Sequence, residues 1–163
     1  MEVTAQELVY TAEDKTQITR DYRKLLRGVV MKGDDSKNIR QAFELAVEAH
    51  QRQRRKSGEP YILHPIEVAR ICVDEIGLGP TAVISALLHD VVEDTTVTLE
   101  EIESKFGKKI ANIVDGLTKL DKAFAKDSPQ AENFKKILKT LTQDVRVVLI
   151  KMADRLHNMR TIG

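Results

Sequence analysis

A mostly apolar run at positions 82–92 is interrupted by two adjacent ionisable residues, His89 and Asp90. Its composition is that of a helix buried on most sides. Burying a charged group is costly unless the group is paired or binds a metal ion. Glu93 and Asp94 follow at once, so ionisable groups crowd the end of this helix. The pattern predicts a metal site with catalytic carboxylates beside it.

The composition favours an all-α fold. Aromatic residues make up only 4% of the 163 residues and hydrophobic residues 42%, with no Trp. A helical core of Leu, Ile, Val and Ala fits these values better than a β-sandwich does. We predict a helical, partly mobile N-terminal extension over residues 1–35 and one main domain over residues 36–163. Because the chain stops directly after its last predicted helix, we expect a piece of a longer protein.

Apolar periodicity and boundary residues predict the positions of the helices. Residues 52–60 are basic and contain Gly and Pro, which indicates a loop. The Val-rich segment 145–150 has the composition of a strand, but no partner strand is evident, so we predict helix there. Ser36, Thr98 and Ser128 are the expected N-caps. The predicted helices cover residues 18–30, 36–49, 65–76, the segment after Pro80 up to 94, 98–107, 109–120, 128–141 and 144 onwards.

Charge and cysteine content limit the partners and the compartment. The net charge is +1, so no global field attracts nucleic acid or membranes. The single cysteine, Cys72, excludes an internal disulfide and indicates a reducing compartment. The sequence shows neither a signal peptide nor an apolar run of membrane-spanning length. We therefore expect a cytoplasmic protein that binds neither membrane nor nucleic acid.

Two further residues are candidate metal ligands beside His89 and Asp90, which are neighbours around the helix axis and can contact one ion. His64 precedes Pro65 at a helix start, and Asp154 lies in the apolar last helix. A hydrogen-bonded structural histidine and a surface pair of Asp154 with Arg155 are the alternatives. The combination favours a metal site, because imidazole and carboxylate are common ligands of divalent metals.

The remaining histidines receive supporting roles. His50 precedes the basic loop on a helix of mixed faces, and we predict a structural role for it. His157 lies three residues after Asp154, on a similar face, and is expected to pack beside the ligands or support them.

The order His, His-Asp, Asp resembles the HD superfamily of metal-dependent phosphohydrolases. Five segments also resemble the hydrolase domain of RelA/SpoT-homologue proteins: 55–62, 64–65, 88–95, 114–120 and 154–161. The resemblance implies an all-α helical bundle that holds a divalent ion, usually manganese. It also implies a bacterial enzyme that removes pyrophosphate from the 3′ position of the alarmones ppGpp and pppGpp, which ends the stringent response. The ligands would be His64, His89, Asp90 and Asp154.

The resemblance assigns catalysis to Glu93 and Asp94, one turn beyond the ligands, where a carboxylate can orient or deprotonate water. A solvent-exposed acidic cluster at the helix end is the alternative. The resemblance places Arg55, Lys56 and Ser57 around the guanine, whereas composition alone favours a solvated basic loop.

Residues of the last helix are candidates for the rest of the nucleotide. Asn158 and Thr161 follow Asp154 at helical spacing, so they share its face and can reach ribose or base. Lys119 and Lys122 are weaker candidates for phosphate contact, and we expect them on a solvated face.

Two other functions stay open. One is an HD phosphohydrolase that acts on another nucleotide, such as NADPH. The other is a non-catalytic domain that senses alarmone and regulates a synthetase elsewhere in the protein. The resemblance implies synthetase and regulatory domains in the full-length protein as partners.

Overall fold

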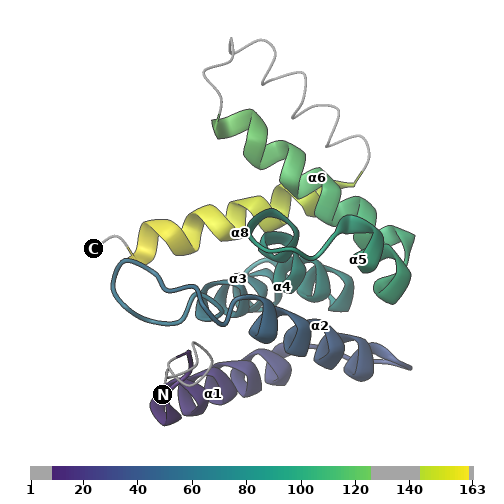
Figure 1. The fold of residues 1–163 in the computed structure, drawn as a ribbon. Helices are drawn as coiled ribbons and strands as arrows, with labels where there is room; N and C mark the ends of the chain where they lie inside the picture. Colours follow the sequence, from purple (N-terminus) through teal and green to yellow (C-terminus); the bar gives the residue numbers. More distant parts are fainter. Residues whose placement is uncertain (1–8, 126–143, 162–163) are drawn as a thin grey trace.

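The structure is a computed structural model that describes residues 9–125 and 144–161. Over these ranges the chain forms helices joined by short connections (Figure 1). The described ranges contain no β-strand, and one isolated bridge pairs Arg54 with Pro60. The all-α prediction is confirmed. The helices are α1 (Ala12–Gly28), α2 (Asp35–Ala49), α3 (Leu63–Asp74), α4 (Pro80–Asp94), α5 (Leu99–Phe106), α6 (Lys108–Ala125) and α8 (Val145–Thr161).

Helix α4 is the centre of the bundle (Figure 1). Helices α2, α3, α6 and α8 all pack against it, while α1 packs on α3, and α5 on α6. Every residue from Ala82 to Val91 is buried, including His89 and Asp90. The surrounding apolar core is continuous and includes Ile18 and Leu25 of α1. The sequence run that predicts a buried helix therefore forms the central one.

Two predicted helix starts are wrong. Helix α1 begins at Ala12 instead of residue 18, because Thr11 and Asp14 form a capping box in which each side chain accepts the other's backbone N–H. Helix α2 begins one residue before Ser36, with Asp34 in the N-cap position, so Ser36 is not the cap. Of the predicted N-terminal extension, residues 1–8 lie outside the described residues.

The other boundaries agree better with the sequence. Helix α4 ends at Asp94 as predicted, and Thr98 caps α5 by accepting a hydrogen bond from the Glu101 N–H. Helix α6 extends past the predicted residue 120 to Ala125. Residues 145–150 are helical, so the strand alternative is excluded. The helix predicted for 128–141, with Ser128 as its cap, lies outside the described ranges.

The outer face of α8 is apolar and exposed. Met152 and Met159 are 58% and 67% exposed. The sequence pattern of this apolar helix instead predicts that its apolar residues are buried together with Asp154. The helix buries only the stripe that ends at Asp154. The two methionines line a groove of about 740 Å³ between α8 and the end of α3. Among the described helices, none combines the length and apolarity that crossing a membrane requires.

Candidate metal centre

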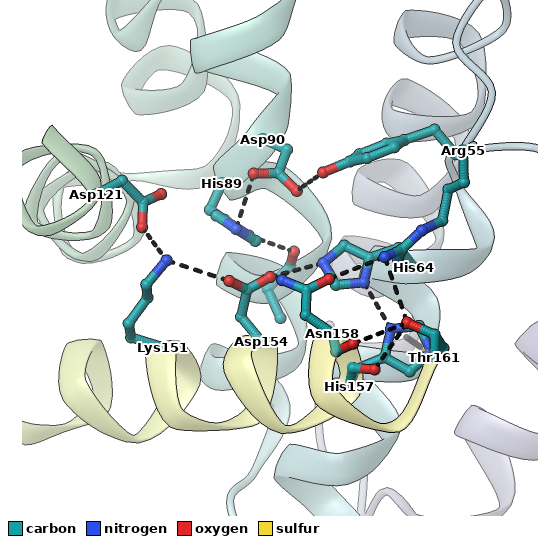
Figure 2. Close-up of polar contacts among 12 residues, drawn as sticks. Arg55, His64, His89, Asp90, Asp121, Lys151, Asp154, His157, Asn158 and Thr161 are labelled. Carbon is teal, nitrogen blue, oxygen red and sulfur yellow. Dashed lines mark hydrogen bonds and ion pairs between the residues drawn. The ribbon is translucent and has the colours of Figure 1, made fainter. Parts of the chain in front are cut away.

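Helices α3, α4 and α8 bring the four predicted ligands to one buried place (Figure 2). His64 lies in the first turn of α3, His89 and Asp90 in the last turns of α4, and Asp154 in the middle of α8. Their residues are only 2–7% exposed. Such burial of ionisable groups is stable only when they are paired or bind a cation.

The four side chains are linked in pairs. His64 Nε2 lies 2.6 Å from Asp154 Oδ1, and His89 Nε2 lies 2.9 Å from Asp90 Oδ1. The second oxygen of Asp90 accepts a hydrogen bond of 2.7 Å from the hydroxyl of Tyr61. Sequence analysis did not identify Tyr61, although it lies between Arg55 and His64 in a segment that carries the resemblance.

The ring of His89 is oriented by the backbone of its own helix. Its Nδ1 lies 3.0 Å from the carbonyl oxygen of Ala86, which only accepts, so Nδ1 carries a proton and Nε2 faces the site. Burial opposes a charged ring, but the Asp90 and Asp154 carboxylates and the Ala86 carbonyl together outweigh burial and raise the pKa of His89 to about 10. The charge of His89 in turn lowers the pKa of Asp90 against the effect of burial. The site therefore favours a positive charge next to its carboxylates.

Two residues missed by the sequence analysis, Asp121 and Lys151, complete this cluster (Figure 2). Asp121 is a further candidate ligand, because one possible ligand atom of its carboxylate lies within 4.8 Å of one such atom in His89 and one in Asp90. Lys151 forms ion pairs with Asp121 and, at 3.2 Å, with Asp154. Burial opposes the charge of Lys151, but these partners raise its pKa, so the ammonium group stays charged. In the sequence, the only indication that Lys151 lies near the site was its position three residues before Asp154 on the same helix.

His157 contacts a predicted ligand directly, as its predicted supporting role requires. Its Nδ1 lies 2.6 Å from Nδ1 of His64, and the two rings stack at 4.8 Å. Burial and the charge of His64 lower the pKa of His157 to about 4, which keeps this ring neutral at physiological pH. A neutral ring bonded to the far nitrogen of His64 fixes the orientation in which Nε2 faces Asp154.

Glu93 and Asp94 lie at the open end of α4, and both residues are exposed. Partial burial of the carboxyl and the charges of Asp121 and Asp90 raise the pKa of Glu93 to about 8. Burial and the charge of Asp90 also raise the pKa of Asp94. A carboxyl group with a pKa near neutrality, next to a cation site, is suited to proton transfer.

Three of the five predicted nucleotide-binding residues meet at the far side of the centre (Figure 2). Arg55 donates to Asn158 Oδ1 at 2.9 Å and lies 3.5 Å from the hydroxyl of Thr161. The second guanidinium nitrogen of Arg55 is buried and has no hydrogen-bond partner among the described residues. Lys56 and Ser57 are exposed on the same loop, and Ser57 donates to Glu59.

The weaker phosphate candidates lie apart from this group. Lys119 is exposed and pairs with Asp115 at 2.9 Å, and Lys122 is also exposed. Both positions are those of a solvated face, as expected.

The donor set fits a divalent cation. The imidazoles of His64 and His89 and the carboxylates of Asp90 and Asp154 lie buried as two pairs, in a place that already attracts positive charge. Among the described residues, His89, Asp90 and Asp121 bring their ligand atoms within 4.8 Å of one another, whereas His64 and Asp154 do not join that group. Imidazole and carboxylate groups are common ligands for manganese, iron, zinc and cobalt alike. Next to a phosphate ester, such a site can activate water and stabilise the charge of the transition state.

The chain is similar to several known proteins. A protein-family model described as "HD domain" matches residues 42–163. The chain is 51% identical over 132 residues to the "Bifunctional (p)ppGpp synthase/hydrolase SpoT" of Escherichia coli, an alignment that covers 80% of this chain and 19% of that protein. It is 50% identical over 127 residues to the "Guanosine-3′,5′-bis(diphosphate) 3′-pyrophosphohydrolase" of Vibrio cholerae, covering 77% of this chain and 18% of that protein. The chain thus spans about a fifth of the length of these relatives.

A solved structure is also similar. It is described by the words "A metazoan ortholog of SpoT hydrolyzes ppGpp and plays a role in starvation responses". The TM-score is 0.61 at 27% sequence identity, and the match covers 81% of this chain and 72% of the other.

Proposed function

Because the chain belongs to the HD-domain family, as the resemblance predicted, we propose that it removes pyrophosphate from the 3′ position of ppGpp and pppGpp. The fold implies a divalent ion, and we propose one Mn²⁺ held by His64, His89, Asp90 and Asp154. The observation that carries the proposal is the burial of these four side chains beside Arg55. The names of the relatives support the choice of substrate.

The ion supplies two effects when bound: it lowers the pKa of water, and it polarises a phosphoryl oxygen. The chain's own residues hold it in a fixed place. Tyr61 and the backbone of Ala86 orient Asp90 and His89, and His157 orients His64. Residues oriented in this way keep the geometry that catalysis needs.

Glu93 and Asp94 act on the nucleophilic water. With a pKa near neutrality, the Glu93 carboxylate takes a proton from the water. At the same time the oxygen of the water forms a bond to the phosphorus that is linked to the ribose. The bond between that phosphorus and the 3′ oxygen breaks, and the 3′ oxygen takes up a proton. The products are pyrophosphate and GDP from ppGpp, or GTP from pppGpp.

Arg55 places the nucleotide in this geometry. Its guanidinium bridges to Asn158 and Thr161, so the loop and α8 form one surface next to Asp154. A planar guanidinium held in this way can stack on a purine. Lys56 and Ser57 contact the guanine end from the exposed part of the loop, and Asn158 and Thr161 reach the ribose or the base.

Since the curated relatives are about five times longer, we propose that synthetase and regulatory domains accompany this domain in the full-length protein. Residues 1–35 would form an extension and residues 36–163 the hydrolase domain, in keeping with the family match from residue 42 onward. We place the protein in the cytoplasm of a bacterium, where its action ends the stringent response.

The test is release of pyrophosphate from ppGpp and pppGpp, and of phosphate from NADPH, by the wild-type chain and by Asp90→Ala, with and without Mn²⁺. We expect release from the two alarmones only, dependent on Mn²⁺ and lost in the variant. Release from NADPH at a comparable rate refutes the alarmone assignment. Binding of ppGpp without release indicates a sensor in place of a hydrolase.

A further inference from the structure

His50, at the end of α2, is a buried histidine that the proposed mechanism does not use. Its residue is 0% exposed, and its ring lies against Tyr61 with the ring centroids 5.0 Å apart. Burial disfavours the charged form of the ring and lowers the pKa of His50. Nδ1 is hydrogen-bonded to Oε1 of Gln53, and Nε2 has no partner among the described residues. The contact with Gln53 is therefore the feature that fixes this ring.

Gln53 connects His50 to the end of α4. Its side-chain nitrogen donates to the carbonyl oxygen of Asp94 at 3.3 Å, across 41 residues of sequence. A carbonyl only accepts, so the amide nitrogen of Gln53 must face Asp94 and the amide oxygen must face His50. His50 consequently carries its proton on Nδ1. In this series of two hydrogen bonds, His50 donates to the amide oxygen of Gln53, and the amide nitrogen of Gln53 donates to the Asp94 carbonyl.

The Asp94 carbonyl is one of the last carbonyls of α4 and has no partner within the helix. Gln53 caps it from the basic loop. The same loop contacts α4 a second time through Tyr61 and Asp90, and the Tyr61 N–H donates to the Gln53 carbonyl at 2.9 Å. The loop that carries Arg55 is thus fastened to the helix end that carries Glu93 and Asp94.

We infer that Gln53, oriented by the buried ring of His50, is a positioning residue that fixes the Glu93–Asp94 end of α4 relative to the basic loop. This inference rests on the proposed function only for its catalytic consequence. Reacting groups must be held within a fraction of an ångström, and a misplacement of about 1 Å costs about 100-fold in rate. Gln53 touches neither the ligands nor the nucleotide, so its effect falls on kcat.

The test compares Gln53→Met, Gln53→Glu and the control Gln51→Met. Gln51 lies on the same loop, and its side chain makes no hydrogen bond to the described part of the chain. The methionine removes both contacts of Gln53. The glutamate keeps an acceptor for His50 but has no donor for the Asp94 carbonyl, and it remains informative if the methionine variant does not fold.

Two readouts are measured: amide hydrogen exchange over residues 91–96, and steady-state hydrolysis of ppGpp. We expect faster exchange in both Gln53 variants, and a fall in kcat of about ten-fold or more with Mn²⁺ affinity within about two-fold of wild type. Exchange and kcat equal to those of Gln51→Met overturn the inference, as does a wild-type profile for Gln53→Glu. If the wild-type chain hydrolyses no alarmone, the proposed function fails, and hydrogen exchange alone decides the inference.

Discussion

The Tyr61 hydroxyl donates at 2.7 Å to the carboxylate of Asp90, whose side chain alone is 9% exposed, and Tyr61→Phe removes this bond while keeping the ring. A hydrogen bond to a charged group contributes about 1.5–3 kcal/mol to stability, so the free energy of unfolding should fall by this amount at neutral pH. His89 and Tyr61 both lower the pKa of Asp90, against the effect of burial. A carboxylate with a lowered pKa stabilises the fold above its unfolded pKa, and this contribution is lost as the pH falls. The deficit of the variant should therefore shrink in acid.

The assay is urea unfolding of the metal-free protein at neutral and at acidic pH, with Tyr22→Phe as the control. Tyr22 stacks on Phe43 at 3.8 Å, and its hydroxyl makes no hydrogen bond within the described ranges. We expect the control to differ from wild type by less than about 0.5 kcal/mol. Mn²⁺ titration should also show a loss of affinity of about ten-fold for Tyr61→Phe. A Tyr61→Phe protein as stable as wild type at neutral pH refutes the role assigned to this bond.

Three further results are expected. The pKa of Glu93 is raised from 4.5 to about 8, so the contribution of its carboxyl group to stability is lost as the pH rises through this range. In urea unfolding, the free energy of unfolding of metal-free Glu93→Gln should equal that of wild type at low pH and exceed it at high pH. Equal free energies at every pH would contradict the assigned pKa. Arg55→Met should raise KM for ppGpp by about ten-fold or more and leave Mn²⁺ affinity unchanged, which steady-state kinetics and calorimetry measure; an unchanged KM would remove Arg55 from the nucleotide site. Thr98→Ala should lower the unfolding free energy by about 1 kcal/mol through the lost cap of α5, whereas the exposed Thr96→Ala should not, and equal values would exclude capping.

The central helix was predictable because its signal is local. An apolar run ending in four ionisable residues defines α4, and Pro65 marks the start of the helix that carries His64. The four predicted ligands belong to motifs that the sequence displays directly. The proximity of the pair formed by His64 and Asp154 to the pair formed by His89 and Asp90 follows from the packing of α3 and α8 against α4.

Apart from His157, which helical spacing placed beside Asp154, the residues that support the ligands were not predictable in the same way. Tyr61 and Gln53 reach α4 across 29 and 41 residues, and no periodicity records such contacts. Asp121 enters the site only because α6 crosses the bundle beside α4, in a stretch whose sequence equally fits a solvated face. Met152 likewise fits the apolar pattern of a buried stripe, yet tertiary packing leaves it exposed.

We propose above that four buried side chains hold one divalent ion for alarmone hydrolysis. The most direct measurement strips the chain of metal with a chelator, returns Mn²⁺ in steps, and follows GDP and pyrophosphate formed from ppGpp. We predict that activity returns in parallel with the binding of one ion per chain, and that Asp154→Ala neither binds the ion tightly nor recovers activity. Full activity of the stripped protein, or intact ppGpp at saturating Mn²⁺, would contradict the claim.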